Sequence, residues 1–333
     1  MKDLPQELVD SIIDYLHPSI PTLLSCALVH PTWTARSQKL LLSYVSLRPP
    51  LPSSSSSVQP HSSSKSKAAK LLWTLQSKPG LTRHITHLAL CEGSPLNSTT
   101  WLTTDRSVVP LLRLIASSST LSTSSSHPST PHSHLRKVEL TATYVHYWDL
   151  LPQTYISALL HMLKSSSVEC VRVHSWVFRD FRSLAGLVGC VRRGGTLSVS
   201  SVTICGGWAG DDDDEERSAD EDADANGEEV EHAGEDDGEH GEDEEGLQVL
   251  TLDFVTFPHM HEWLARSLPS PTHLNRSIRP AGHLSLHSLR QLRLAQFQTH
   301  DPHVLQLILN HVPQLEYLHF KPGSWRGASS YCP

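Results

Sequence analysis

The residues with the clearest potential for chemistry are the histidines, of which the chain has 22. Their best local arrangement is His259-x-His261-Glu262, which places two imidazoles and a carboxylate within four residues. Such groups can bind zinc, but no partner set of Cys, His or Asp stands at ligand spacing beside them. The neighbouring Trp263 and Leu264 favour the start of an ordinary helix. We therefore expect no metal site and no cofactor.

Other catalytic motifs are missing from the sequence. It contains no GxxxxGK[ST] phosphate loop, no GxGxxG turn, no GxSxG nucleophile turn and no HExxH metal motif. The six cysteines (26, 91, 170, 190, 205 and 332) include no CxxC pair, which argues for reduced thiols. Cys170 and Cys205 sit in apolar segments and are expected in the core. These features favour a protein that is not an enzyme and has no catalytic residue.

A strongly acidic tract spans residues 211–245. It holds 21 Asp and Glu residues and a single basic residue, Arg217, in 35 positions. Because it has few apolar residues to bury, we expect a disordered insertion. The rest of the chain has 26 Lys and Arg against 14 Asp and Glu, a net charge of +12. Two roles fit the tract: a solubilising loop, which is the simpler one, or a screen for a basic surface.

The elements that would position a site begin with three short apolar helices in residues 1–47. The first collects Leu8, Val9, Ile12, Ile13 and Leu16 on one face. A second is predicted from the capping residue at position 19 to about position 28, and a third from about 32 to 42, after a His-Pro break. A unit of this size buries little apolar surface, so a partner is expected.

These residues resemble the F-box, especially the F-box-like proteins of fungi. The resemblance consists of a Leu-Pro-x-Glu-Leu opening, an Ile-Ile pair, an Ala-Leu-Val segment and a Trp. The matching residues are Leu4, Pro5, Glu7, Leu8, Ile12, Ile13, Ala27, Leu28, Val29 and Trp33. The sequence departs from the family before the Trp, where His30-Pro31-Thr32 replaces a frequent Cys-Arg. This departure bears on affinity for the family's partner rather than on the fold.

The resemblance implies docking onto the Skp-family adaptor of a cullin-RING (SCF-type) ubiquitin ligase, while the rest of the chain presents a substrate protein. By the same analogy, the adaptor-binding residues are Leu4, Pro5, Leu8, Ile12, Leu24, Leu28, Val29 and Trp33. The alternative for these helices is that they pack on the following domain and bind no second protein.

Beyond the helices, a Ser-rich linker is predicted at 48–70, and residues 71–325 repeat the pattern apolar-x-x-apolar-x-apolar. The copies are Ile85/Leu88/Leu90, Leu135/Val138/Leu140, Val168/Val171/Val173, Val199/Val202/Ile204, Leu247/Leu250/Leu252, Leu289/Leu292/Leu294 and Leu315/Leu318/Phe320. The segments between several copies switch to helical spacing, at 156–163, 181–191 and 304–312. Short strands alternating with helices indicate parallel β-α units.

That alternation resembles the leucine-rich repeat arrays common behind F-boxes, although none of the seven copies has Asn or Cys at its ninth position. The predicted fold is α/β: an F-box-like module (1–47), the linker (48–70), an irregular leucine-rich-repeat-like domain (71–325) and a tail (326–333). Within the domain we expect a Ser/Thr/Pro-rich loop at 117–134 and the acidic insertion at 211–245. An ordinary α/β domain is the alternative, and strand order distinguishes the two. The strands at 199–204 and 247–252 could form a hairpin or separate repeats.

Several aromatic side chains lie near the predicted strand ends. Trp148, Trp176, Trp208 and Trp325 are expected to cover the sheet rather than to serve as binding anchors. His84 and His87 flank a strand and are expected to be partly exposed.

The sequence as a whole predicts a substrate-recognition adaptor of an SCF-type ubiquitin ligase. Its expected partners are a Skp-family adaptor and a substrate protein that the sequence does not identify, with no nucleic acid. No apolar run of 18 residues and no signal peptide occur, so we expect no membrane contact and a cytoplasmic or nuclear location, or both. The alternative is a ligase-independent interaction scaffold.

Overall fold

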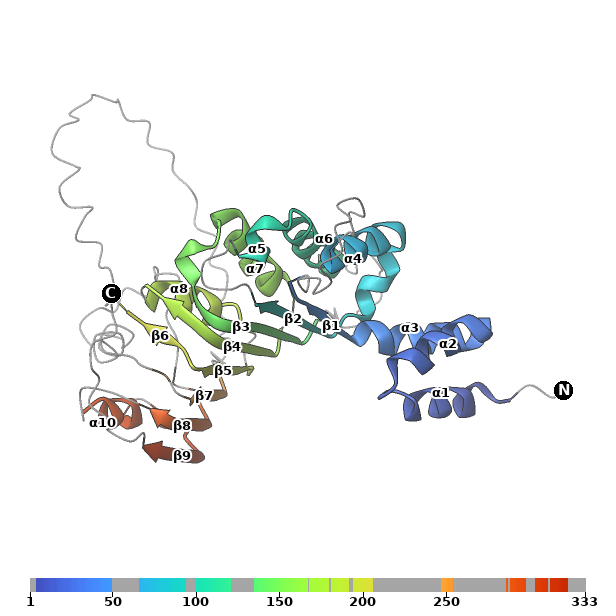
Figure 1. The fold of residues 1–333 in the computed structure, drawn as a ribbon. Coiled ribbons are helices and arrows are strands. Elements are labelled where there is room, and N and C mark those ends of the chain that lie inside the picture. Colours follow the sequence, from blue (N-terminus) through green and yellow to red (C-terminus); the bar gives the residue numbers. More distant parts are fainter. Residues whose placement is uncertain are drawn as a thin grey trace, which may run out of the picture.

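The computed structural model describes residues 4–49, 66–93, 100–120, 135–166, 168–179, 181–191, 194–205, 247–253, 255, 286, 288–297, 303–310 and 312–322. Its first part is helical, and strands and helices then alternate (Figure 1). The elements are α1 (Gln6–Tyr15), α2 (Ile20–Val29), α3 (Pro31–Ser43), β1 (Tyr44–Leu47), α4 (Lys67–Ser77), the 3-10 helix η1 (Pro79–His84), β2 (His87–Glu92), α5 (Trp101–Thr104), α6 (Val108–Thr120), β3 (Lys137–Tyr147), η3 (Trp148–Leu150), α7 (Gln153–Ser165), β4 (Cys170–Phe178), α8 (Phe181–Val188), β5 (Thr196–Ser200), β6 (Thr203–Ile204), β7 (Val249–Asp253), β8 (Gln291–Phe297), α10 (His303–Asn310) and β9 (Tyr317–Pro322).

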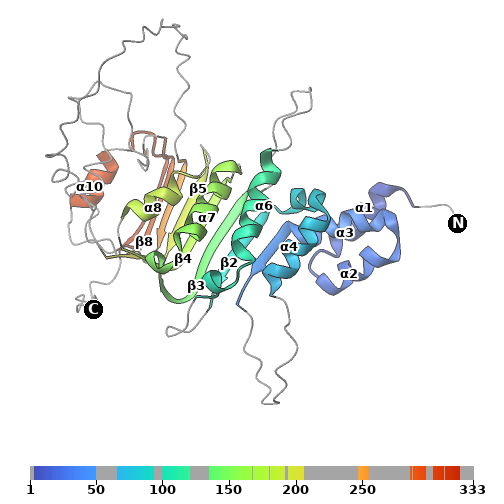
Figure 2. The same ribbon diagram turned by 90° about the horizontal axis from the view of Figure 1, so that it is seen from above.

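One parallel sheet organises the chain after the first three helices. Its strands lie side by side in chain order, β1-β2-β3-β4-β5-β7-β8-β9, and the short β6 pairs with β4. Helices α4, α6, α7 and α8 cover one face of this sheet in both views (Figures 1 and 2). The protein is therefore a mixed α/β fold. Among the described strands, the sequential order is that of stacked neighbouring units and not that of a doubly wound sheet.

The repeated apolar pattern is in register across the sheet. The first ladder joins Val45, Leu88, Val138, Val171, Leu197, Leu250, Leu292 and Leu318. The second joins Leu47, Leu90, Leu140, Val173, Val199, Leu252, Leu294 and Phe320. These side chains are buried except on the last strand, where Leu318 and Phe320 are 41% and 45% exposed. Six of the seven predicted copies fall on the ladders at the expected positions.

The copy predicted at Val199/Val202/Ile204 has the wrong register. Val199 belongs to the second ladder and Leu197 to the first, so the strand begins at Thr196. The apolar pattern misled because Gly194 occupies the position where the other copies have an aliphatic residue.

Val202 and Ile204 are nevertheless buried, because the chain continues past Ser201 in the same direction as β5 and forms β6, which also pairs in parallel with β4. Ser201 has φ 53°, and Ser175 and Gln296 have φ 60° and 50° at matching points of β4 and β8. At the ninth pattern position, where a leucine-rich repeat has Asn, the chain buries Trp176 on β4 and Val255 two residues after β7. Strands β5 and β7 pair in parallel, so they are separate units and not a hairpin.

The helical module ends at Ser43, earlier than predicted, because residues 44–47 form β1 and pair with β2. The segment Leu42-x-x-Val45-x-Leu47 is thus an eighth copy of the pattern, which the prediction missed. Thr86 reinforces the junction, donating from its backbone N and its Oγ1 to the Ser43 carbonyl at 3.1 and 2.9 Å. Helix α3 also packs against η1.

Two predicted loops are shorter than expected. Helix α4 begins at Lys67, within the predicted linker 48–70, and Ser66 Oγ accepts from the Ala69 N–H at 3.0 Å as its N-cap. The Ser-rich segment therefore connects β1 to α4 and does not separate the helical module from the sheet. Helix α6 continues to Thr120, into the predicted loop 117–134.

The burial of individual residues partly follows the predictions. Trp148 and Trp176 are core residues, with ring centroids 5.7 Å apart in an edge-to-face arrangement. Cys170 is only half-buried, and Cys205, just after β6, is exposed, so the core prediction for the cysteines is wrong. His84 and His87 are partly buried, as expected.

Other predictions fall outside the described residues: most of the linker (50–65), the acidic tract 211–245, His259-x-His261-Glu262, Trp208, Trp325 and the tail 326–333. Within the part of the chain that the structure describes, no helix combines the length and apolarity needed to cross a membrane.

Candidate interaction surfaces

Helix α1 carries two apolar stripes that face in different directions. Val9 and Ile13 point inward and are buried, Ile13 completely. Leu4, Leu8 and Ile12, spaced four residues apart, face solvent, and Leu8 is 53% exposed. The single buried face expected from the sequence is thus divided into an inner and an outer stripe.

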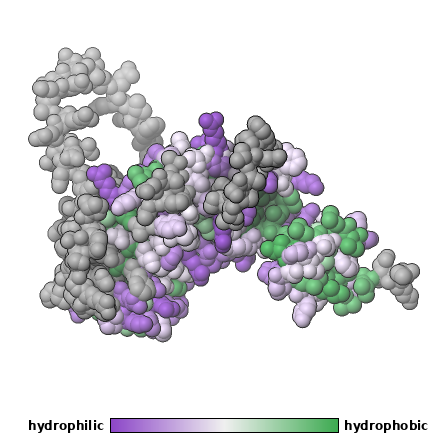
Figure 3. Space-filling model, in the orientation of Figure 1, coloured by the Kyte–Doolittle hydropathy of each residue, from purple (hydrophilic) through white to green (hydrophobic). Residues whose placement is uncertain are grey.

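Helix α2 repeats this arrangement. Leu23 is 1% exposed and packs inside the module, whereas Ile20, Leu24 and Leu28 face outward at four-residue spacing. Leu28 is 88% exposed. Figure 3 shows apolar surface gathered over this module. Leu4 lies just before α1 and extends its exposed row. We call the two exposed rows the outer stripes; they consist of Leu4, Leu8, Ile12, Ile20, Leu24 and Leu28.

A small core and a few polar contacts hold the module together. Val9, Ile13 and Leu23 form its buried cluster, with Trp33 packed against them. Arg36 of α3 donates to both carboxylate oxygens of Asp14 on α1, from Nε at 2.6 Å to Oδ1 and from a terminal nitrogen to Oδ2. The hydrogen bond from Arg36 lowers the pKa of Asp14.

The structure exposes most of the predicted adaptor-binding residues. Leu4, Pro5, Leu8, Ile12, Leu24, Leu28 and Val29 all face solvent. Trp33 does not, because it is half-buried against the module core. Sequence reasoning missed Ile20, which is 62% exposed in the outer stripe of α2, and Tyr15, which is 87% exposed at the end of α1. The four-residue spacing of Ile20, Leu24 and Leu28 was the available signal for Ile20.

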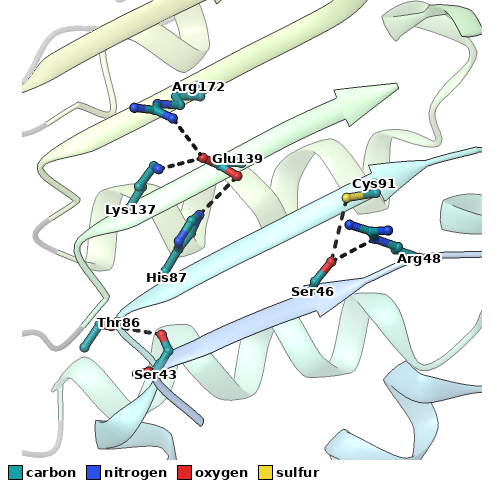
Figure 4. Close-up of polar contacts among 9 residues, drawn as sticks. All are labelled: Ser43, Ser46, Arg48, Thr86, His87, Cys91, Lys137, Glu139 and Arg172. Atoms are coloured by element: carbon teal, nitrogen blue, oxygen red, sulfur yellow. Dashed lines mark hydrogen bonds and ion pairs between the residues drawn. The ribbon is translucent and has the colours of Figure 1, made fainter. Parts of the chain in front are cut away.

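A second surface is the sheet face opposite the helices, which we call the open face. It presents the residues that alternate with the buried ladders, and no described helix covers it (Figure 1). Towards the β1 edge of the sheet, this face carries a polar cluster centred on Glu139 of β3. Figure 4 shows Glu139 among three basic groups. Its Oε1 lies 2.6 Å from Lys137 Nζ and 3.4 Å from an Arg172 terminal nitrogen.

His87 is the third basic group around Glu139. Its Nε2 lies 3.2 Å from Glu139 Oε2, but the contact lacks the alignment of a hydrogen bond. Burial lowers the pKa of His87 despite the opposing effect of the carboxylate. For Glu139, burial would raise the pKa, yet the hydrogen bond from Lys137 and the nearby basic groups lower it.

The middle of the open face is built from small hydroxyl side chains. Thr196, Ser198 and Ser200 on β5 and Thr251 on β7 are all half-buried. Ser200 Oγ shares a 2.7 Å hydrogen bond with His174 Nδ1 on the neighbouring β4.

Charged residues border these hydroxyls. Ser198 pairs with Arg172 on one side and with Thr251 on the other, and Thr251 in turn pairs with Arg293. Asp253 lies beside Ser200 at the carboxyl end of β7. The result is a row of arginine, serine, threonine and arginine across four strands.

The open face offers recognition chemistry more readily than catalysis. Within the described part of the chain, no carboxylate stands behind the imidazole that contacts Ser200, because Asp253 lies on the far side of Ser200. Among the described residues, no group of three or more His, Cys, Asp or Glu side chains could hold a metal ion.

No protein-family model matches this chain, and no curated protein matches its sequence.

Proposed function

We propose that this protein is a substrate-recognition adaptor of an SCF-type ubiquitin ligase. The outer stripes would dock on a Skp-family adaptor, and the open face of the sheet would bind a substrate protein. The sequential parallel sheet supports a leucine-rich-repeat-like assignment for the second part of the chain. The ligase would supply the chemistry.

The exposure of the outer stripes is the observation that carries this proposal. Six aliphatic side chains on two short helices and on the residue that precedes the N-cap of α1 are exposed to solvent: Leu4, Leu8, Ile12, Ile20, Leu24 and Leu28. Isolated exposed aliphatic residues are common, but a gathered set of this kind marks an interaction site. This exposure favours the adaptor over the alternative scaffold, because helices that packed on their own repeat domain through these side chains would bury them.

The test is co-purification of the full chain with a Skp-family adaptor. Leu8→Asp and Leu28→Asp should each weaken binding at least about tenfold, because a buried carboxylate would replace an apolar anchor. Both side chains are exposed, so the melting temperature should stay near that of the wild type. Leu150→Asp is the matched control, since Leu150 is 71% exposed on η3, away from the module.

Two results would remove the proposal: no adaptor retained by the wild-type chain, or equal loss in the Leu150 control. Trp33→Ala is a poorer probe, because truncating this half-buried side chain would also weaken the module core.

A further inference from the structure

We infer that the open face binds an extended, carboxylate-rich segment of a partner protein, held between Arg172 and Arg293. The inference rests on the proposed function, because it gives the chemical class of the substrate that this face would present.

The row across the middle of the sheet sets the geometry. Arg172, Ser198, Thr251 and Arg293 are successive neighbours on β4, β5, β7 and β8. Strands in a sheet lie about 4.8 Å apart, so the Cα atoms of the two arginines are roughly 14 Å apart. An extended chain covers that distance in about four residues. Two acidic residues at that spacing could therefore meet both guanidinium groups.

The residues between the arginines leave room for such a chain. Ser198 and Thr251 are short, so the longer arginine side chains can rise on either side of them. Their hydroxyl groups can both donate and accept hydrogen bonds, which suits the peptide groups of an extended ligand.

The charges of the open face favour an anionic ligand. The described residues of this face carry a net charge of +3 with histidines neutral: the basic ones are Arg48, Lys137, Arg172, Arg293 and Lys321, and the acidic ones are Glu139 and Asp253. Arg293 is exposed and has no ion-pair partner among the described residues. Arginine pairs with carboxylates through two parallel hydrogen bonds, which gives the recognition both strength and orientation.

The two acidic residues restrict where the ligand can lie. Glu139 already engages Arg172 from the β3 side, so an incoming carboxylate competes with it. Asp253 lies two residues after Thr251 on β7, towards the carboxyl ends of the strands. Repulsion from Asp253 therefore confines the ligand to the row of the two arginines.

The experiment measures binding of a fluorescein-labelled 16-residue peptide of alternating Glu and Ser to the full chain by fluorescence anisotropy. A peptide of alternating Gln and Ser is the control ligand. Arg172→Gln combined with Arg293→Gln should weaken binding about tenfold. Glu139→Gln should tighten it about threefold by releasing Arg172 and Lys137. Arg113→Gln combined with Lys164→Gln, two exposed basic residues on α6 and α7, should change nothing.

Several outcomes would overturn the inference. Equal weakening by Arg113→Gln combined with Lys164→Gln would show that the peptide is attracted only by the overall positive charge of the protein. Tight binding of the Gln peptide would show that the site does not recognise carboxylates. If the full chain binds no acidic peptide but a chain lacking 211–245 does, the site belongs to the chain's own acidic tract. This assay uses no Skp-family adaptor, so its failure and that of the proposed function are distinguishable.

Discussion

Replacing Glu139 by Gln tests whether the basic cluster on the open face stabilises the fold. The substitution keeps the size of the side chain and removes its charge. It therefore breaks the ion pairs of the carboxylate with Lys137 Nζ at 2.6 Å and with Arg172 at 3.4 Å. A hydrogen bond to a charged group contributes about 1.5–3 kcal/mol, but Arg172 is 55% exposed and water screens the pair. We expect the free energy of unfolding to fall by about 1 kcal/mol.

The assay is thermal unfolding at several pH values. A loss of this size should lower the melting temperature by about 2–4 °C in a domain of this length. The folded-state pKa of Glu139 lies below its ordinary value, so its stabilisation is complete above that ordinary value. It disappears as the pH falls through the folded-state pKa. The difference between wild type and Glu139→Gln should therefore be present at pH 7 and absent in strong acid.

Glu169→Gln is the control, because it removes a carboxylate from a weaker ion pair. Glu169 is 52% exposed, and its Oε1 lies 3.9 Å from Arg136 Nε. This variant should lose less than about 0.5 kcal/mol. Equal losses in the two variants, or a loss in Glu139→Gln that persists in strong acid, would refute the assignment of a stabilising cluster. Removal of Glu139 should also lower the pKa of His87 further, since the carboxylate raises it, and an NMR titration would measure that change.

Two further predictions concern stability, each measured by chemical denaturation. Leu23→Ala should lower the free energy of unfolding by about 2–5 kcal/mol, because Leu23 is buried in the module core. Leu24→Ala, on the outer stripe, should lower it by less than about 1 kcal/mol. Similar losses in the two variants would contradict the two-stripe description. Ser175→Gly should be neutral or stabilising by up to about 1 kcal/mol, because glycine tolerates φ 60°, whereas Ser198→Gly in the extended β5 should destabilise by roughly 0.5–1 kcal/mol. A destabilising Ser175→Gly would argue against strain at that turn.

The strands were predictable because each follows one simple rule. Two apolar residues spaced two apart face the helices, and a third stands three positions earlier. The rule failed at β5, because Gly194 stands where the third apolar residue is expected. Val202 and Ile204 then completed the pattern in a register that the strand does not have. It also overlooked β1, because the helical pattern of α3 runs directly into the strand at Tyr44.

The surfaces were less predictable than the strands. Helical periodicity places Leu8 and Val9 on the same broad face of α1, yet only the packing of α2 and α3 decides that Val9 is buried and Leu8 exposed. The open face could not be assembled from the sequence at all. Its central row joins Arg172 to Arg293, more than a hundred residues apart in the chain, and only strand register makes them members of one row.

The position of the Ser-rich segment changes how the two surfaces are related. A linker between the helical module and the sheet would let them move independently. Instead, α3 ends at Ser43 and β1 begins at Tyr44, with no residue between them. The Tyr44 ring also meets His87 edge to face, with centroids 4.5 Å apart, beside the hydrogen bonds from Thr86. A protein bound to the outer stripes would therefore be held in one orientation relative to a ligand on the open face, whatever the length of the Ser-rich segment.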